Sequence, residues 1–409
     1  MKKYTSSTSL IKTVFIVLLT AWFSSPSTAQ TLESKRFTLD RENFVDTVKI
    51  KIWDGAIVVP VEIAGKTRNM MFDTGAKMGF WIGAEEDWMT PSGDSLLVFD
   101  SQNQSQKKAI IKFPSIKMGN TTIENYPMIV DEGMGGWTCG EIDGGLGCDL
   151  VAKGLSFKFD TKDSLMIVTD RKGFFAKEEK GRPMLKYKEE DHPHVFVKFP
   201  FGRIKMLFDS GYVGGWIDLP QYLLNKWSAD DKKMRQGLEK VTVQVDTTII
   251  TTAGLFGTTH ETVEDKLLHI PETDLGGLML KDLWASTGTQ SLKIGSALLK
   301  QVSLIIDAHK KRLVFLPHDG SSEVVVGNED KEGFALTAAE EGDTLGAIKA
   351  VVRKGSKEYQ KGLRTGDYLI SDDGVPVPDI CTYKMLRRQG KLKRLVFRSP
   401  EGIEKEIDW

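Results

Sequence analysis

The amino-acid sequence predicts a mainly β protein made of two similar halves and a smaller α+β module at the C-terminal end. Short apolar segments that alternate with polar residues, separated by Gly-rich turns, dominate residues 30–325, and this pattern is typical of antiparallel strands. Four of these segments recur in the same order in both halves of the region, which indicates an internal repeat. Helical patterns are confined there to short pieces such as residues 219–238. A polar stretch at 318–333 then separates the C-terminal module, as expected for a linker.

The bulk composition fits this view. The chain has 409 residues, enough for two or three domains. Hydrophobic residues make up 40% of it and charged residues 27%, values that are ordinary for globular proteins. The formal net charge of -1 gives no basis for nucleic-acid binding or for electrostatic attachment to a membrane.

The first 29 residues differ from the rest. Lys2 and Lys3 precede an apolar run at residues 14–23, and small residues follow it, ending in Ser27-Thr28-Ala29. This order predicts a secretory signal peptide at residues 1–29 and export to the periplasm or the extracellular space. A membrane anchor is the alternative, but the run is shorter than the ~20 residues that a spanning helix needs.

The repeat is most easily seen around two acidic turns. The stretch MMFDTGAKMGFW (70–81) is echoed by KMLFDSGYVGGW (205–216), so that Asp73 corresponds to Asp209. Each stretch is preceded by an alternating strand and a turn, which predicts two hairpins whose second strand ends at the Asp.

The similarity continues after the turns. Residues 116–131 resemble residues 270–286, and residues 144–168 resemble residues 292–316. The predicted domains are therefore lobe one (30–175), lobe two (176–325) and the C-terminal module (326–409).

Paired acidic turns suggest one kind of chemistry. Two carboxyl groups brought within about 3 Å share a proton, so one is a base and the other an acid at the same pH. A water molecule between them can then attack an amide without a covalent intermediate. Asp73 and Asp209 are the predicted catalytic pair, and the sequence does not assign the base.

The residues beside the carboxyls support this reading. The hydroxyls of Thr74 and Ser210 are expected to hydrogen-bond across the two turns. Gly75 and Gly211 permit a tight turn and a close backbone approach.

These motifs resemble those of the pepsin/retropepsin-like aspartic proteases. The resemblance implies two all-β barrels around a cleft for an extended peptide or protein substrate, and an aspartic-type endopeptidase that needs no metal and no cofactor. Tyr212 stands where the family usually has Ser, Thr or Ala, and it is expected to crowd the site or fill a subsite. The family's flap would fall near residues 99–114, where no flap Tyr is present, and the Gly- and Thr-rich residues 251–260 are a candidate loop near the cleft.

Other conspicuous residues have plainer explanations. Trp81 and Trp216 are expected in the core rather than in contact with substrate. His192 and His194 do not come with the Cys or Glu pattern of a metal site. Three cysteines are present, and an oxidising compartment permits a bridge between Cys139 and Cys148, although two separate thiols are at least as compatible with the sequence.

The C-terminal module resembles a PDZ domain through SKEYQKGLRTGDYLISDDG (356–374), with residues 379–390 as the groove helix and two closing strands after it. The resemblance implies an α+β fold that binds a ligand with a free C-terminus by strand addition. The best candidate for the loop that binds the carboxylate is Gly333-Phe334-Ala335-Leu336. A module that binds nothing is the alternative.

Two functions are therefore compared: a secreted or periplasmic aspartic endopeptidase with a PDZ module, and an inactive protease-like protein that grips peptides without cutting them. The intact pair of acidic turns favours the enzyme, and Tyr212 favours the binding protein. Because both lobes lie in one chain, a monomer suffices for the site. The sequence does not give the cleavage specificity, the pH optimum or the PDZ ligand.

Overall fold

The computed structural model describes residues 37–408, except for 54, 102–103, 132–137, 189–191, 255, 328–332 and 340–342. The predicted signal peptide lies outside these residues. Strands account for 49% of the structure and helices for 14%, so the predicted all-β class of the chain is confirmed. Among the described residues, no helix has both the length and the apolar character needed to cross a membrane.

The first sheet belongs to lobe one and is built around a closed ring of six strands. Its strands are β1 (Thr38–Leu39), β3 (Lys51–Trp53), β4 (Ala56–Ile63), β5 (Lys66–Phe72), β6 (Gly79–Ile82), β7 (Thr90–Phe99), β8 (Ser105–Met118), β9 (Thr121–Asp131) and β10 (Gly144–Leu146). The strand order is β1-β9-β6-β10-β5-β4-β8-β7, with β3 beside β4. The ring closes because β9 pairs with β8 as well as with β6, which leaves no open edge among those six strands.

A second sheet is shared by the two lobes. Its strands are β2 (Val45–Lys49), β11 (Ser156–Asp160), β12 (Leu165–Thr169), β13 (Met184–Lys186), β21 (Val302–Asp307) and β22 (Arg312–Pro317). Their order is β13-β22-β21-β11-β12-β2, so each lobe contributes three adjacent strands. The lobes join where β11 pairs antiparallel with β21, with Phe157 opposite Ile306 and Phe159 opposite Leu304. All four of these side chains are buried, and the joint is therefore apolar.

The third sheet belongs to lobe two. Its strands are β14 (His194–Phe199), β15 (Gly202–Phe208), β16 (Ile217–Asp218), β17 (Thr242–Gly254), β18 (Gly257–Leu275), β19 (Leu278–Ser286), β20 (Lys293–Ile294) and β23 (Glu323–Val325). In β14, Val195, Val197 and Phe199 are buried while Phe196 and Lys198 are exposed, the alternation expected of a strand with one face on the core.

The two lobes contain equivalent elements in the same order. The β4–β5 hairpin corresponds to β14–β15, the short strand β10 to β20, and the β11–β12 hairpin to β21–β22. The pairing is equivalent as well, because β10 lies parallel to β5 and β20 lies parallel to β15. The short helix α3 (Asp149–Ala152) likewise matches the 3-10 helix η1 (Ser296–Lys300).

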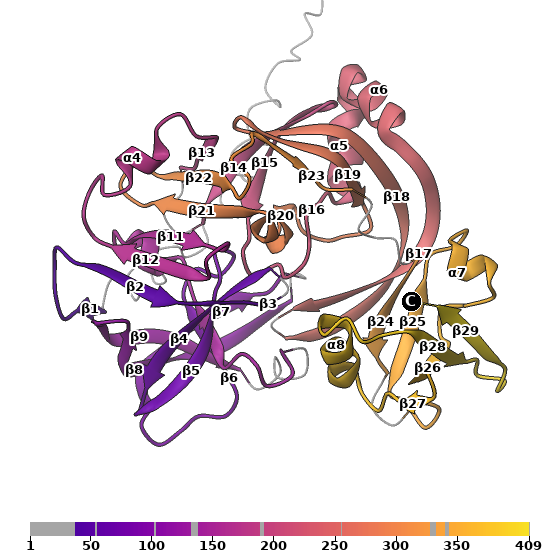
Figure 1. Cartoon of the computed structure of the whole chain (residues 1–409), viewed down its shortest axis with the longest axis horizontal. Helices are drawn as coiled ribbons and strands as arrows, with labels where there is room; N and C mark the ends of the chain where they lie inside the picture. Colours follow the sequence, from indigo (N-terminus) through magenta and orange to yellow (C-terminus); the bar gives the residue numbers. More distant parts are fainter. Residues whose placement is uncertain are drawn as a thin grey trace, which may run out of the picture.

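The remaining helices of the lobes are short and lie at the periphery (Figure 1). They are α4 (Ala176–Glu179), α5 (Gln221–Asp230) and α6 (Lys232–Val241). The last two occupy the segment where the sequence predicts helix, at 219–238, and Asp231 caps α6 by accepting a hydrogen bond from the Met234 amide at 2.9 Å.

The C-terminal domain has its own sheet and its own core. Its elements are β24 (Phe334–Ala338), β25 (Ile348–Val352), α7 (Lys357–Gln360), β26 (Tyr368–Asp372), β27 (Val375–Pro376), α8 (Ile380–Arg388), β28 (Arg394–Arg398) and β29 (Glu404–Asp408). The strand order is β24-β25-β26-β28-β29, with β27 beside β26, so β24 lies at an edge of the sheet.

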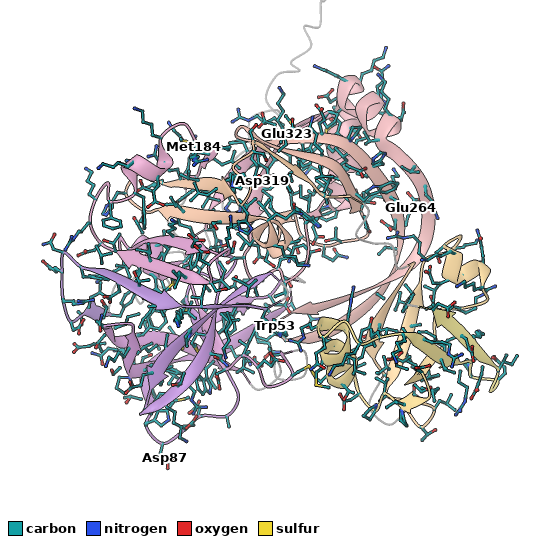
Figure 2. The ribbon with its side chains drawn as sticks, viewed as in Figure 1. Trp53, Asp87, Met184, Glu264, Asp319 and Glu323 are labelled. Carbon is teal, nitrogen blue, oxygen red and sulfur yellow. A yellow bond between two sulfur atoms is a disulfide. The ribbon has the colours of Figure 1, made fainter. Side chains whose placement is uncertain are left out.

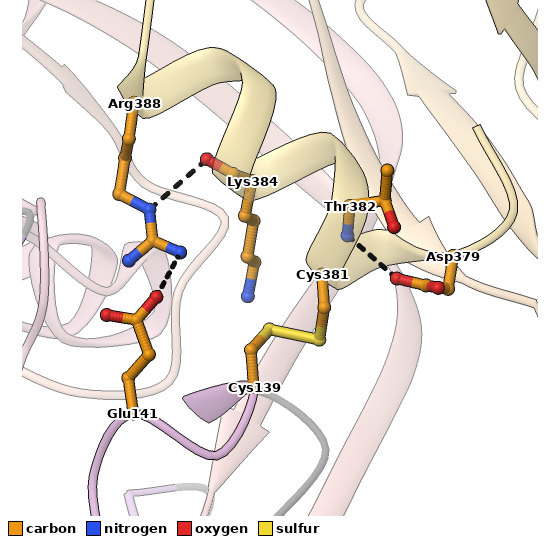
Figure 3. Close-up of a disulfide and its surroundings, with 7 residues drawn as sticks. All are labelled: Cys139, Glu141, Asp379, Cys381, Thr382, Lys384 and Arg388. Atoms are coloured by element: carbon orange, nitrogen blue, oxygen red, sulfur yellow. Dashed lines mark hydrogen bonds and ion pairs between the residues drawn. A yellow bond between two sulfur atoms is a disulfide. The ribbon is translucent and has the colours of Figure 1, made fainter. Parts of the chain in front are cut away.

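A disulfide ties this domain to lobe one. Cys139 is bonded to Cys381 at the start of α8, across a sequence separation of 242 residues (Figure 3). The bridge between Cys139 and Cys148 that the sequence permits is therefore wrong. Cys148 is buried behind the first acidic turn, where its thiol donates to the carbonyl of Thr74 at 3.4 Å, while Cys139 is bonded to the C-terminal domain.

The contact around the disulfide is polar and aromatic. Arg388, at the other end of α8, forms an ion pair with Glu141 at 2.9 Å. Its guanidinium also lies 5.2 Å from the ring centroid of Trp53. Trp53 is on the side of lobe one that faces the C-terminal domain (Figure 2).

The two tryptophans and two histidines singled out in the sequence lie in ordinary structural settings. Trp81 is buried in the main core against Trp88 and Phe113, and Trp216 packs partly buried against the same core. The rings of His192 and His194 lie 6.0 Å apart. Within the described ranges, no group of three or more His, Cys, Asp or Glu side chains is arranged to hold a metal ion.

Candidate active site

Two acidic turns meet where the lobes face each other. β5 ends at Phe72 and β15 ends at Phe208, so Asp73 and Asp209 are the first residues after two equivalent strands. Both strands are buried at these ends, because each is flanked on both sides by other strands of its sheet. The fold therefore carries each carboxyl out of an apolar core and turns the chain immediately afterwards.

Reciprocal hydrogen bonds hold the two turns together. The Thr74 hydroxyl accepts from the Ser210 amide at 2.9 Å and donates to the Phe208 carbonyl at 2.5 Å. The Ser210 hydroxyl accepts from the Thr74 amide at 3.0 Å and donates to the Phe72 carbonyl at 2.7 Å. Both side chains are 0% exposed, so water does not compete for these bonds. The arrangement is the one expected of Thr74 and Ser210.

The glycines after them allow the turns to approach. A Cβ atom on Gly75 would lie 2.5 Å from Oδ1 of Asp209, and one on Gly211 would lie 2.4 Å from Cγ of Asp73. Any larger residue would collide with the carboxyl of the opposite turn. Each carboxyl thus lies against the glycine of the opposite turn, close enough for the charge of Asp209 to act on Asp73.

Backbone amides fix the orientation of each carboxyl. Oδ1 of Asp73 accepts from the amides two and three residues later, at 2.8 and 3.2 Å. Oδ1 of Asp209 accepts from the two equivalent amides, both at 3.0 Å. The second oxygen of each group is left for other partners.

The pair is electrostatically coupled. Burial, followed by the negative charge of Asp209, raises the pKa of Asp73 to about 7, while the turn amides and Lys293 oppose this rise. Asp73 therefore holds a proton in a large share of molecules at neutral pH. One protonated and one ionised carboxyl is the state in which such a pair can act as acid and base.

Lys293 is a residue of the site that the sequence interpretation missed. Its ammonium group lies 3.5 Å from Oδ2 of Asp209 and 4.3 Å from the ring centroid of Tyr212. The sequence held a signal, because a lysine interrupts an apolar segment where the repeat has Gly145 in lobe one.

Tyr212 packs within lobe two. Its ring occupies the space that a Cβ on Gly215 or Gly295 would need, and its hydroxyl donates to Oδ1 of Asp218 at 2.8 Å. Burial raises the pKa of Asp218, with Lys293 and the tyrosine hydroxyl opposing. Tyr212 thus contacts the Lys293 ammonium with its face and Asp218 with its edge.

A second buried acid lies behind the lobe-one turn. Burial raises the pKa of Asp149 to about 8. Its Oδ1 accepts a hydrogen bond from the Tyr126 hydroxyl at 2.6 Å, and that hydroxyl accepts from the Gly147 amide at 3.2 Å. Asp149 and Tyr126 thus hold the segment that carries Gly147 and Cys148.

Two hairpins meet at their tips. β7–β8 spans the region where the resemblance places a flap, and the expected loop at 251–260 is instead the end of the long β17–β18 hairpin (Figure 1). Thr residues favour strands, which explains the error. The Phe256 amide donates to Asp100 at 3.4 Å, and the Lys108 ammonium lies 5.2 Å from the Phe256 ring.

The inner face of β7 is apolar. Leu96 and Val98 pack against a buried cluster that also contacts Ala76, which follows Gly75, and Val213, two residues after Gly211. The lobe-one hairpin therefore shares an apolar cluster with residues close in sequence to both acidic turns.

The candidate carboxylate-binding loop of the C-terminal domain makes a hydrogen bond within its own domain. The Gly333 amide donates to the buried carboxylate of Glu358 at 3.0 Å. Phe334 is buried and begins β24, Ala335 is exposed, and Leu336 is partly buried against the domain core. The helix α8 lies beside β24, so an edge strand and a helix flank this part of the domain.

A cavity of about 370 Å³ lies elsewhere, at the foot of the lobe-one sheet near the disulfide. Its lining residues are Lys51, Ile52, Trp53, Val58, Asn69, Gly140 and Glu141. All of these residues belong to lobe one, and two of them, Trp53 and Glu141, also contact Arg388 of the C-terminal domain.

A comparison of the chain with models of known protein families and with curated proteins finds no match.

Proposed function

We propose that this chain is an aspartic endopeptidase of the pepsin/retropepsin-like type that hydrolyses peptide bonds in extended peptides or proteins. The observation that carries the proposal is the pair of acidic turns locked together by four buried hydrogen bonds between Thr74, Ser210 and the strand ends. A structural role alone does not account for two carboxyls held face to face, since placing them together is costly.

The proposed reaction needs no covalent intermediate. A water molecule held between Asp73 and Asp209 attacks the carbonyl carbon of the scissile bond, the ionised carboxyl accepts its proton, and the protonated carboxyl donates to the carbonyl oxygen. The pKa of about 7 for Asp73 supports one bound proton over much of the acid to neutral range.

The proposed architecture is two β lobes of this family with a PDZ module after them. Equivalent strand pairings in both lobes and the shared six-stranded sheet support the first part. The two hairpins that meet at Phe256 and Asp100 are proposed to cover a substrate bound over the carboxyl pair.

For the PDZ module we propose binding of an extended peptide along the free edge of β24, beside α8. Edge strands bind peptides through backbone hydrogen bonds. A ligand with a free C-terminus would need the Gly333 amide, which now donates to Glu358. Comparing the binding of two otherwise identical peptides, one with a free C-terminus and one amidated, separates recognition of the chain end from strand addition.

We also propose that the protein is exported. The disulfide between Cys139 and Cys381 supports an oxidising compartment, since such bonds rarely persist in a reducing cytosol.

The test is cleavage of a peptide library by the purified chain between about pH 3 and 8. Asp73→Asn and Asp209→Asn should each abolish cleavage, while Asp319→Asn, an exposed carboxyl in lobe two, should not. Binding of peptides without cleavage in the unmodified chain would instead support the non-enzymatic alternative. Cleavage that survives in either pair variant would refute the proposal.

A further inference from the structure

Lys293 makes the carboxyl pair asymmetric. The residue begins β20, between β15 and β16, and its side chain is 9% exposed. A buried ammonium is costly unless it is paired, and its partner here is Oδ2 of Asp209 at 3.5 Å. The face of Tyr212 adds a second favourable contact at 4.3 Å from the ring centroid.

Lobe one offers nothing equivalent at this place. Gly145 occupies the corresponding position of β10, and a Cβ there would lie 2.3 Å from the Phe80 ring. A lysine therefore fits behind one carboxyl and not behind the other. The repeat has kept its backbone symmetry while its charge distribution differs between the halves.

We propose that Lys293 is a positioning residue that determines which carboxyl of the pair is the base. It holds Asp209 ionised as the base and leaves Asp73 as the proton donor. This inference rests on the proposed function, because base and donor are roles in that reaction. It assigns which of the two carboxyls is the base, a point that the sequence leaves open.

The resulting reaction balances in two steps. First, the water oxygen bonds to the carbonyl carbon, the water proton passes to Asp209, and the Asp73 proton passes to the carbonyl oxygen. Then the carbon–nitrogen bond breaks, Asp209 gives its proton to the leaving amine, and a hydroxyl of the former carbonyl carbon returns a proton to Asp73. Both carboxyls end in their starting states.

The titratable groups around Lys293 agree with this assignment. Asp209 contacts it directly, and Asp218 and Asp73 are both acted on by its charge. The Tyr212 hydroxyl is committed to Asp218. Burial raises the pKa of Asp218 while Lys293 opposes the rise, and the ion pair that Lys293 makes at 3.5 Å is with Asp209.

The test is the pH profile of kcat/KM for Lys293→Met and for Lys293→Arg, which keeps the charge. The positive charge favours ionised carboxyls, so its loss should move both limbs of the profile to higher pH, by about 1 to 3 units. Lys293→Arg should leave both limbs in place. Unchanged limbs in an active Lys293→Met variant would overturn the proposal, whatever its effect on kcat.

A second measurement does not depend on activity. Carbon-13 NMR of aspartate labelled at the side-chain carboxyl, assigned with Asp73→Asn and Asp209→Asn, follows each group through its titration. The proposal requires Asp209 to ionise before Asp73 in the unmodified chain, and the reverse order refutes it even if Lys293→Met does not fold. A chain that shows this order but cleaves no peptide contradicts the proposed function and leaves the ionisation assignment standing.

Discussion

The hydrogen bonds between the acidic turns make a sharp prediction for Thr74→Val. Valine has nearly the shape of threonine, so the change removes the hydroxyl and little else. The Ser210 amide and the Phe208 carbonyl, its partners at 2.9 and 2.5 Å, would remain buried without a bond. Each such loss costs about 1–3 kcal/mol, so the free energy of unfolding should fall by about 2–6 kcal/mol.

A double-mutant cycle with Ser210→Ala tests whether the turns act as one unit. Opening the joint by either change weakens the bonds of the other hydroxyl, so the double variant should lose less stability than the two single losses together, by about 0.5–3 kcal/mol. Urea unfolding followed by tryptophan fluorescence and circular dichroism supplies the free energies.

Thr169→Val is the matched control. Thr169 is equally buried, and its hydroxyl also makes two bonds, to the Phe44 carbonyl at 2.6 Å and from the Arg171 amide at 3.1 Å. Combined with Ser210→Ala, it should be additive within about 0.5 kcal/mol. A Thr74→Val loss below about 1 kcal/mol, or additivity equal to that of the control, would refute the reciprocal lock.

Two further outcomes are expected. The pKa of Asp149 is raised to about 8 from an ordinary value of 3.8. Its contribution to stability is therefore complete at low pH and is lost by up to about 1.4 kcal/mol per pH unit as the pH rises from about 4 to 8. Asp149→Asn, which resembles the protonated acid, should flatten this pH dependence in urea unfolding, and an unchanged slope would contradict it. At the hairpin tips, Phe256→Ala removes the contact with Lys108, worth about 0.5–1 kcal/mol, and should lower kcat/KM by about 2- to 5-fold. The control is Phe99→Ala, which should leave kcat/KM unchanged because Phe99 is 64% exposed. Equal effects of the two changes would show that the contact between the tips does not contribute to activity.

Much of the site could be predicted because its signals are local. The two Asp-Thr/Ser-Gly turns follow strands that the alternating pattern reveals, and the repeat shows that they are equivalent. The roles of Thr74 and Ser210 follow from the residue types, since a short hydroxyl side chain bonds readily to nearby backbone.

Other features depend on contacts that no local pattern encodes. Lys293 reaches Asp209 because β20 lies beside β15. The lysine itself stands out against Gly145 of the repeat, but a strand of two residues does not reveal which strand it pairs with. Cys139 pairs with Cys381 only because α8 packs against lobe one, which is a matter of how domains dock. The glycines at 251–260 predict a loop, whereas the threonines beside them favour the strands that form the end of the β17–β18 hairpin.

The bond between Cys139 and Cys381 closes a covalent ring that contains all of lobe two. A single cut of the backbone between Val326 and Phe334 would therefore leave both fragments attached to each other until a reductant is added. On a denaturing gel such a nicked chain would run as one species without reductant and as two with it. The proposed peptidase, if cut there by its own activity or by that of neighbouring molecules, would therefore keep its C-terminal domain.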